Sequence, residues 1–212
     1  WDEVSGYGKV MASGAVQSAI DGNYPEIPPR TIIPVAMDTL SGYLSGYTYT
    51  YDGHAKTPSI TLFNKWGNRL LNGRDYSTIY SGGRTAVGMY SVTANQVRAR
   101  YYGSQTKQFT IIPKGTSVKK LYRYKGAFRV KWRKQSTKMT STRITGYQVQ
   151  YSNYSNMTAA KIKTIKGYNN TRKTIRNLSK NKKYYVRIRT YMKTGGTAYY
   201  SNWSGIKSVK TR

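Results

Sequence analysis

Short runs in which apolar and polar residues alternate recur along most of this chain, and they constrain its fold more than any other feature. The clearest runs cover residues 47–51, 59–63, 128–132, 147–151 and 184–188. A period of two places successive side chains on opposite faces of a β-strand, so each run predicts a strand with one buried and one solvated face. Strands this short, separated by turn pairs such as Asp52-Gly53, are typical of a sandwich or barrel.

Further strands are expected at residues 78–80, 89–94, 97–101 and 108–112, and no helical period of 3.6 residues persists in this part of the chain. The length of 212 residues suits two immunoglobulin-sized modules. We therefore expect an all-β protein with two tandem antiparallel β-sandwich domains. Residues 1–30 are rich in proline toward their end and predict an irregular or short-helical N-terminal linker. The start at Trp1, without a signal peptide, suggests a processed or excerpted piece.

Charge is distributed very unevenly along the chain. All seven acidic residues lie within the first 75 positions, so no carboxylate side chain occurs from residue 76 to residue 212. Residues 114–212 carry 26 basic and no acidic side chains, a net charge of +26, against +3 for residues 1–113. The 22 tyrosines exclude a disordered basic tail, and the absence of cysteine excludes disulfides and thiolate zinc sites. No apolar run approaches the roughly 20 residues that a membrane span requires.

The second half carries several spaced aromatic and apolar residues. Residues 144–151 read ITGYQVQY, Trp132 stands fifteen residues before Tyr147, and Leu178 stands six residues before Tyr184. This pattern resembles a fibronectin type III domain, with its second-strand tryptophan, its third-strand segment and its tyrosine corner. Lys180 departs from the family, which usually has proline before the sixth strand. The resemblance implies a sandwich in which Trp132, Tyr147, Leu178 and Tyr184 are structural.

The first half resembles a different module. Residues 51–61 read YDGHAKTPSIT, residues 73–80 read GRDYSTIY and residues 107–111 read KQFTI. These segments resemble the small immunoglobulin-like repeats of large surface proteins in anaerobic Gram-positive gut bacteria, which fibronectin-type modules often follow. The resemblance implies an extracellular origin, either wall-attached or secreted. The expected organisation is a linker at 1–30, a bacterial immunoglobulin-like domain at 31–113 and a fibronectin type III-like domain at 114–212.

The sequence offers few residues that could carry out catalysis. His54, the only histidine, follows Asp52-Gly53 in a predicted turn, which favours an exposed turn residue over a catalytic base. Asp52 and Asp75 could serve as the carboxylate pair of a glycosidase, but both occupy expected turn positions, where such side chains accept backbone N–H groups. Scattered acids and one histidine do not readily assemble three or four metal ligands. We expect no catalytic residue, no metal site, no cofactor and no enzymatic activity.

Residues 200–204 read YSNWS, which resembles the Trp-Ser-x-Trp-Ser motif of certain fibronectin-type receptor domains, with Tyr200 in place of the first tryptophan. In that motif aromatic rings interleave with arginines of a neighbouring strand. Arg187 and Arg189 lie on the predicted outward face of the strand at 184–188, so they are the expected partners of Trp203. Cation–π contacts at exposed sites contribute about 0.5–1 kcal/mol each, and the implied role is structural.

Basic residues gather in two segments of the second half, interspersed with tyrosines that suit stacking against sugars or bases. The candidate polyanion-binding residues are Lys119, Lys120, Arg123, Lys125, Arg129, Lys131, Arg133, Lys182 and Lys183. Candidate ligands are wall teichoic acid, sulfated or sialylated host glycans, and nucleic acid. The alternative is a surface whose lysines only maintain solubility, although a domain without acids repels itself.

Together these features predict a non-catalytic adhesion or display module of a cell-surface or secreted bacterial protein. Its basic C-terminal domain is expected to bind an anionic cell-wall polymer or host glycan, and other surface proteins are a further class of partner. Nucleic acid is not expected as a specific ligand, because no groove-reading helix or recognised single-strand fold is evident. Two alternatives stay open: an accessory C-terminal region of a secreted cell-wall or glycan hydrolase, and a decoration protein of a virion or appendage.

Overall fold

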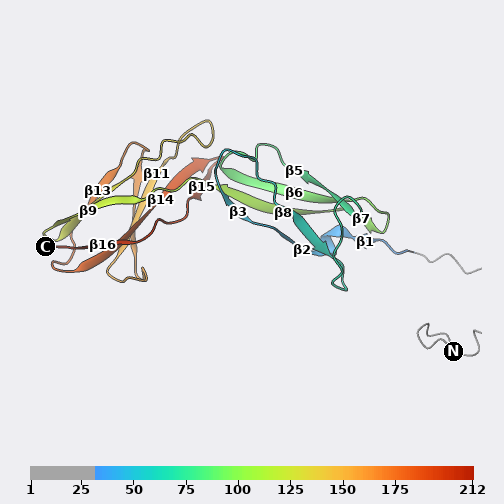
Figure 1. Cartoon of the computed structure of the whole chain (residues 1–212), viewed down its shortest axis with the longest axis horizontal. Helices are drawn as coiled ribbons and strands as arrows, with labels where there is room; N and C mark the ends of the chain where they lie inside the picture. Colours follow the sequence, from blue (N-terminus) through green and yellow to red (C-terminus); the bar gives the residue numbers. More distant parts are fainter. Residues whose placement is uncertain (1–31) are drawn as a thin grey trace, which may run out of the picture. The chain divides into compact units, whose positions relative to one another are not determined.

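The structure is a computed structural model that describes residues 32–212, so the segment expected as a linker at 1–30 lies outside the described residues (Figure 1). The described part of the chain folds into strands β1 to β16 and one short 3-10 helix, η1. The strands form two successive sandwiches, each around its own apolar core. The all-β prediction is confirmed.

The first sandwich contains three sheets. Strands β3, β8, β6 and β5 form a four-stranded sheet in that order, while β2 pairs with β4 and β1 pairs with β7. Two of the pairs, β1 with β7 and β3 with β8, run parallel, a detail that the alternation of residues did not predict. The elements are β1 (Val35–Ala36), η1 (Met37–Thr39), β2 (Ser41–Leu44), β3 (Thr48–Thr50), β4 (Ile60–Phe63), β5 (Tyr76–Tyr80), β6 (Gly88–Gln96), β7 (Tyr101–Tyr102) and β8 (Ser104–Ile112).

The core of this sandwich follows from alternation on its long strands. Val92 and Ala94 of β6 and Phe109 and Ile111 of β8 are buried, whereas most of the residues between them are partly or fully exposed. Leu62 of β4 is among the apolar side chains that meet them from the other layer of the same core. Removal of these apolar surfaces from water drives the two layers together.

The prediction of a strand at residues 97–101 is wrong. The chain turns there instead, with the Tyr101 N–H donating to the Arg98 carbonyl at 3.0 Å, and only Tyr101–Tyr102 become strand β7. Val97 is 51% exposed, so the apolar side of this apparent alternation has no core to cover. Gly103, with a φ of +75°, then reverses the chain into β8, a conformation that glycine adopts readily.

The second sandwich contains two sheets. One has the order β13-β10-β9, and the other has the order β12-β11-β14-β15, with β16 also paired to β14. Every pairing within these sheets is antiparallel. The strands are β9 (Val118–Tyr124), β10 (Ala127–Trp132), β11 (Gly146–Ser152), β12 (Lys161–Lys166), β13 (Arg172–Ile175), β14 (Lys183–Thr194), β15 (Thr197–Tyr200) and β16 (Lys207–Lys210).

The alternation on β10 determines which face of the smaller sheet is buried. Phe128, Val130 and Trp132 point into the core, whereas Arg129 and Lys131 between them lie on the outer face. The Trp132 ring packs against Tyr147 of β11, with ring centroids 5.2 Å apart. Cationic residues therefore reach the surface because their neighbours fill the core.

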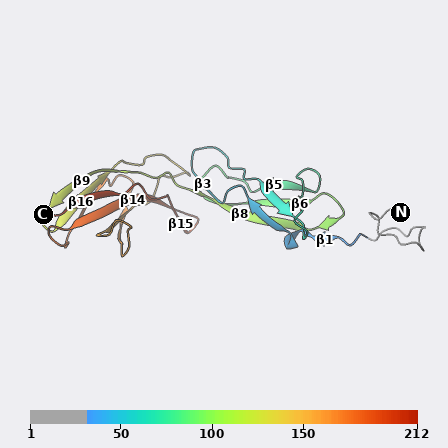
Figure 2. The ribbon, with the colours of Figure 1, turned by 60° about the horizontal axis from the view of Figure 1, so that its bottom comes forward.

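Strands β9 and β16 lie side by side where the two sheets of this sandwich approach each other (Figures 1 and 2). Beyond β16, the Arg212 N–H donates to the Tyr124 carbonyl and the Gly126 N–H donates to the Arg212 carbonyl, both at 2.9 Å. These bonds fix the turn between β9 and β10.

Candidate anion-binding surface

The outer face of the β13-β10-β9 sheet carries a concentration of cations, which we call the basic face. Strand pairing places Lys131 opposite Lys120 of β9 on one side and opposite Arg172 of β13 on the other. These three cations form one line across three neighbouring strands, named here the basic row. In the next line of the sheet, Arg129 lies between Tyr122 and Thr174.

The cations of the basic face are held by aromatic rings and hydroxyl groups. The Lys120 ammonium lies 5.1 Å from the centroid of the Tyr122 ring, and the Arg129 guanidinium lies 5.4 Å from that of Tyr124. Arg129 Nε also donates to Thr174 Oγ1 at 3.2 Å. The second sandwich has no carboxylate side chain that could neutralise these groups, so their charge is available to an external anion.

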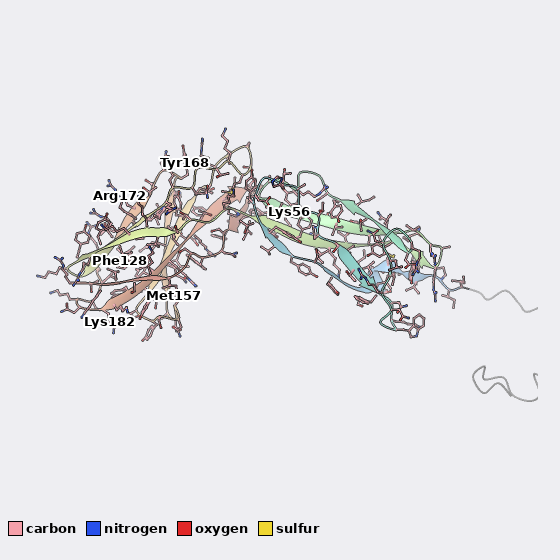
Figure 3. All side chains as sticks on the ribbon, in the orientation of Figure 1. Lys56, Phe128, Met157, Tyr168, Arg172 and Lys182 are labelled. Carbon is pink, nitrogen blue, oxygen red and sulfur yellow. The ribbon has the colours of Figure 1, made fainter. Side chains whose placement is uncertain are left out.

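Only part of the predicted binding set lies on the basic face. Lys120, Arg129 and Lys131 are there, whereas Lys119 sits at a register shift in β9 and Arg123 faces the opposite way, paired with the inward Phe128. The remaining candidates are Lys125 in the β9–β10 turn and Arg133 just after β10, together with Lys182 just before and Lys183 at the start of β14 in the other sheet. Figure 3 shows Arg172 and Lys182 on opposite sides of this sandwich.

The sequence interpretation left Arg172 and Arg176 out of the binding set. Arg172 completes the basic row, and Arg176 follows the last residue of β13. Both belong to the second basic segment of the sequence. The missing signal was the pairing of β13 with β10, because Lys131 and Arg172 lie far apart in the sequence and become neighbours through sheet register alone.

A cleft opens at one end of the basic face, between the β9–β10 turn and the segment that follows β13. Its volume is about 460 Å³. The residues that line it include Tyr124, Lys125, Ala127, Arg129, Thr174 and Arg176. We call it the Ala127 cleft, because the small Ala127 side chain lies between the larger ones.

The other sheet carries an arginine–aromatic ladder on its outer face. The Arg189 guanidinium lies 4.3 Å from the Trp203 ring centroid and 4.1 Å from that of Tyr200, and Arg187 lies 5.0 Å from Trp203. Gln148 and Gln150 of β11 accept hydrogen bonds from Arg189 and Arg187, respectively, at 2.6–2.9 Å. Partial burial lowers the pKa of Arg189 from its ordinary value. Both guanidinium groups are thus occupied by neighbours within the sheet.

Two tyrosines anchor the chain on the core side of this domain. The Tyr184 hydroxyl accepts a hydrogen bond from the Ser179 N–H at 3.2 Å, the geometry of a tyrosine corner, and Leu178 packs partly buried against the core. The Tyr147 hydroxyl donates to the Tyr168 carbonyl at 2.7 Å and accepts from the Gln135 N–H at 2.9 Å. Burial raises the pKa of Tyr147. Both hydroxyl groups therefore hold loops in place.

Asp52 and Asp75 accept backbone N–H bonds, as their turn positions predicted. Asp52 Oδ1 accepts from the His54 N–H at 2.9 Å, and its other oxygen pairs with Lys56. Asp75 is only 4% exposed and accepts from the Leu71 N–H and from Arg74 Nη2, both at 2.8 Å. The hydrogen bonds from Arg74 are the main cause that holds the pKa of Asp75 below its ordinary value. Among residues 32–212, no three His, Cys, Asp or Glu side chains come close enough to hold a metal ion.

Comparison with known proteins identifies the second sandwich. Residues 113–206 match the family model of the fibronectin type III domain. They are a fibronectin type III domain. The resemblance predicted for the second half is thereby confirmed at the level of the domain family, and such domains are typically non-catalytic modules that are commonly extracellular. Within the described part of the chain, no helix has the length and apolar character needed to cross a membrane.

Solved structures that match this chain include tandem modules. The chicken CNTN1 FN1–FN3 domains share 14% identity, with 84% of this chain and 68% of that chain covered and a TM-score of 0.41. Domains A168–A170 of titin share 15% identity, with 86% and 63% covered and a TM-score of 0.35. A β-1,2-glucanase from Parabacteroides distasonis shares 14%, with 57% and 17% covered and a TM-score of 0.35. The comparison with curated proteins finds no match.

Proposed function

We propose that the fibronectin type III domain binds an anionic polymer, either a cell-wall polymer or a host glycan, through its basic face. The chain would then serve as a non-catalytic adhesion or display module of a cell-surface or secreted bacterial protein. The observation that carries this proposal is the basic row, in which Lys120, Lys131 and Arg172 stand opposite one another on three adjacent strands.

Like charges directly opposite each other in a sheet destabilise it, because their repulsion is not offset within the domain. A protein of net charge +29 gains nothing in stability from such a row. Bound anions would remove the repulsion, so the row favours a ligand that supplies several negative charges. This cost is the reason to prefer a binding role over a role in solubility alone.

The spacing of the basic row also suits a polymer better than a single small ion. Adjacent strands in a sheet lie about 4.8 Å apart, so three strands spread the cations over about 10 Å. A chain with regularly repeated anionic groups can contact all three at once, whereas one phosphate or sulfate ion cannot. Tyr122, beside the row, adds a partly exposed ring against which a sugar can stack.

The test is the salt dependence of binding to heparin and to purified wall teichoic acid, measured with the full chain. Neutralisation of the basic row in a Lys120→Gln, Lys131→Gln, Arg172→Gln variant should weaken binding and reduce the slope of log affinity against log salt by about 2 to 3, because fewer counterions are released. The matched control neutralises Lys161, Lys163 and Lys207, which lie on strands of the other sheet. It loses the same net charge but should keep most of the affinity.

Equal losses in the two variants would contradict the proposal, since they would show that total charge rather than the basic face governs binding. Salt-independent binding to a neutral glycan, without retention on heparin, would reject the electrostatic mechanism altogether.

A further inference from the structure

We infer that the Ala127 cleft is a subsite for one acidic sugar unit, in which Arg129 and Arg176 bind a sulfate ester or carboxylate while the ring sits over Ala127. The inference deepens the proposed function and rests on it, since it assigns the monomer unit that an anionic glycan presents. The cleft is distinct from the basic row, because none of the three cations of that row lines it.

The floor and walls of the cleft follow from strand register. Ala127 of β10 pairs with Tyr124 of β9, and it lies on the same face of the strand as Arg129, two residues further on. On the other side, Phe128 pairs with Ile175, so Arg176 follows directly beyond the end of β13. The methyl group of Ala127, 7% exposed, thus forms a floor between an aromatic wall and a cationic wall.

Arg129 is already oriented for an anion. Its Nε donates to Thr174 Oγ1 at 3.2 Å, and its guanidinium lies 5.4 Å from the centroid of the Tyr124 ring. These contacts use one edge and one face of the guanidinium and leave the two terminal nitrogens without a hydrogen-bond partner in the sandwich. Two parallel N–H groups match the oxygens of a carboxylate or sulfate in a bidentate pair.

The rim of the cleft is fixed by backbone hydrogen bonds. The Leu178 N–H donates to the Gly126 carbonyl at 2.9 Å, which ties the segment after β13 to the β9–β10 turn. Gly126 has a φ of +58°, and an added Cβ would lie 3.1 Å from the Leu178 carbonyl oxygen. A side chain at this position would therefore crowd the hydrogen bond between Gly126 and Leu178. A preformed rim lowers the entropy lost when a ligand is ordered.

The volume separates a sugar from a bare anion. About 460 Å³ falls within the range of roughly 300–1,000 Å³ that is typical of small-molecule sites, and one sulfate or phosphate ion would leave most of it empty. Tyr124 is 38% exposed and gives the cleft an apolar surface that a linear polyphosphate cannot use. An acidic sugar can use the cations, the aromatic wall and the space between them.

The experiment measures dissociation constants of the full chain for three probes by titration monitored with NMR. The probes are a trisulfated heparin disaccharide, an unsulfated hyaluronan disaccharide that carries only a carboxylate, and tripolyphosphate, which has no sugar ring. Ala127→Leu fills the floor without a change of charge, and Arg129→Lys keeps the charge but removes the planar pair of donors. Arg123→Lys is the control, because Arg123 lies in the same hairpin outside the cleft.

Both cleft variants should weaken binding of the trisulfated disaccharide by about tenfold. This is the effect of losing one charge-assisted hydrogen-bond pair or an equivalent contact. Ala127→Leu should leave the tripolyphosphate affinity unchanged, and Arg123→Lys should leave every affinity unchanged. If Arg129→Lys also weakens binding of the hyaluronan disaccharide, the cleft binds the carboxylate that both disaccharides carry. A loss confined to the trisulfated disaccharide identifies a sulfate ester instead.

An unchanged disaccharide affinity in both cleft variants, with native NMR spectra, would overturn the inference. Equal losses for the disaccharide and tripolyphosphate in Ala127→Leu would also overturn it, because the cleft would then bind an anion without regard to the ring. Failure of the proposed function can be distinguished from failure of this inference, because the proposed function is tested with heparin chains and with the variant that neutralises the basic row.

Discussion

At the scale of single residues, two tryptophans of the fibronectin type III domain have opposite environments. Trp132 is 3% exposed and packs on Tyr147 in the core, whereas Trp203 is partly exposed and stacks between two arginines. Both positions were predicted from spacing in the sequence, Trp132 through alternation with Arg129 and Lys131, and Trp203 through its motif. Residue type and local period suffice for such positions because each depends on one strand and its immediate neighbour.

We expect the two tryptophans to differ in their contribution to stability. Trp132→Ala removes a large buried side chain and should lower the free energy of unfolding by about 3–5 kcal/mol. Trp203→Ala removes cation–π contacts worth about 0.5–1 kcal/mol each and little buried volume, so its effect should be clearly smaller. Urea unfolding of the full chain, followed by near-ultraviolet circular dichroism, measures both. Equal losses would indicate that Trp203 is part of the core.

At the scale of elements, the sequence predicted strands far better than their partners. Strands β10, β11 and β14 follow from alternation, because one face of each fills a core. The parallel pairing of β3 with β8 was not predictable, since period two gives the face of a strand but not its neighbour. The basic row was missed for the same reason, and the register shift between Lys131 and Trp132 changes which β9 residues face outward.

The loop between β4 and β5 in the first sandwich depends on a buried carboxylate. Asp75 binds the Leu71 N–H and Arg74, and a further cation, Arg98, lies 3.8 Å away. Since its pKa is lower in the folded than in the unfolded state, the stabilisation is complete above the unfolded pKa, near 4, and is lost as the pH falls through the folded pKa.

Asp75→Asn should therefore lower the stability of the first sandwich at pH 7 and reduce the loss of stability in acid. Thermal unfolding at pH 7 and at several values below pH 4 tests this expectation. The opposite result, a steeper acid dependence in the variant, would contradict the role of Asp75. Lys56→Gln serves as a control, because it removes the partner of the exposed Asp52 and leaves Asp75 intact.

At the scale of the whole molecule, the two sandwiches differ in how their charged side chains are paired. The ion pairs found among residues 32–212 all use Asp52 or Asp75 of the first sandwich, while the second depends on rings, hydroxyls and amides to hold its cations. This division was predictable from sequence, since counting residues requires no knowledge of pairing. The use of tyrosine and glutamine as substitutes for carboxylates was not predictable, because it depends on which side chains meet across strands.

We expect salt to affect the two halves of the chain differently. Self-repulsion among 26 cations destabilises the fibronectin type III domain, and screening weakens that repulsion as the Debye length falls from about 30 Å at 0.01 M to about 8 Å at 0.15 M salt. Addition of sodium chloride should thus raise its free energy of unfolding, with a smaller change in the first sandwich. Hydrogen exchange, resolved by peptide, reports each half within the full chain. A fall in the stability of residues 114–212 with salt would contradict this expectation.

Strand β12 has a consequence for how copies of this protein coexist at high density. It is the edge of its sheet, paired only with β11, and it exposes Lys161, Lys163 and Lys166 along its six residues. An unpaired edge is a template for aggregation, and lysines there oppose the approach of a second edge. Two copies that met along β12 would align lysine with lysine and find no acid to relieve the repulsion. Crowded copies should therefore stay separate instead of merging into a continuous intermolecular sheet.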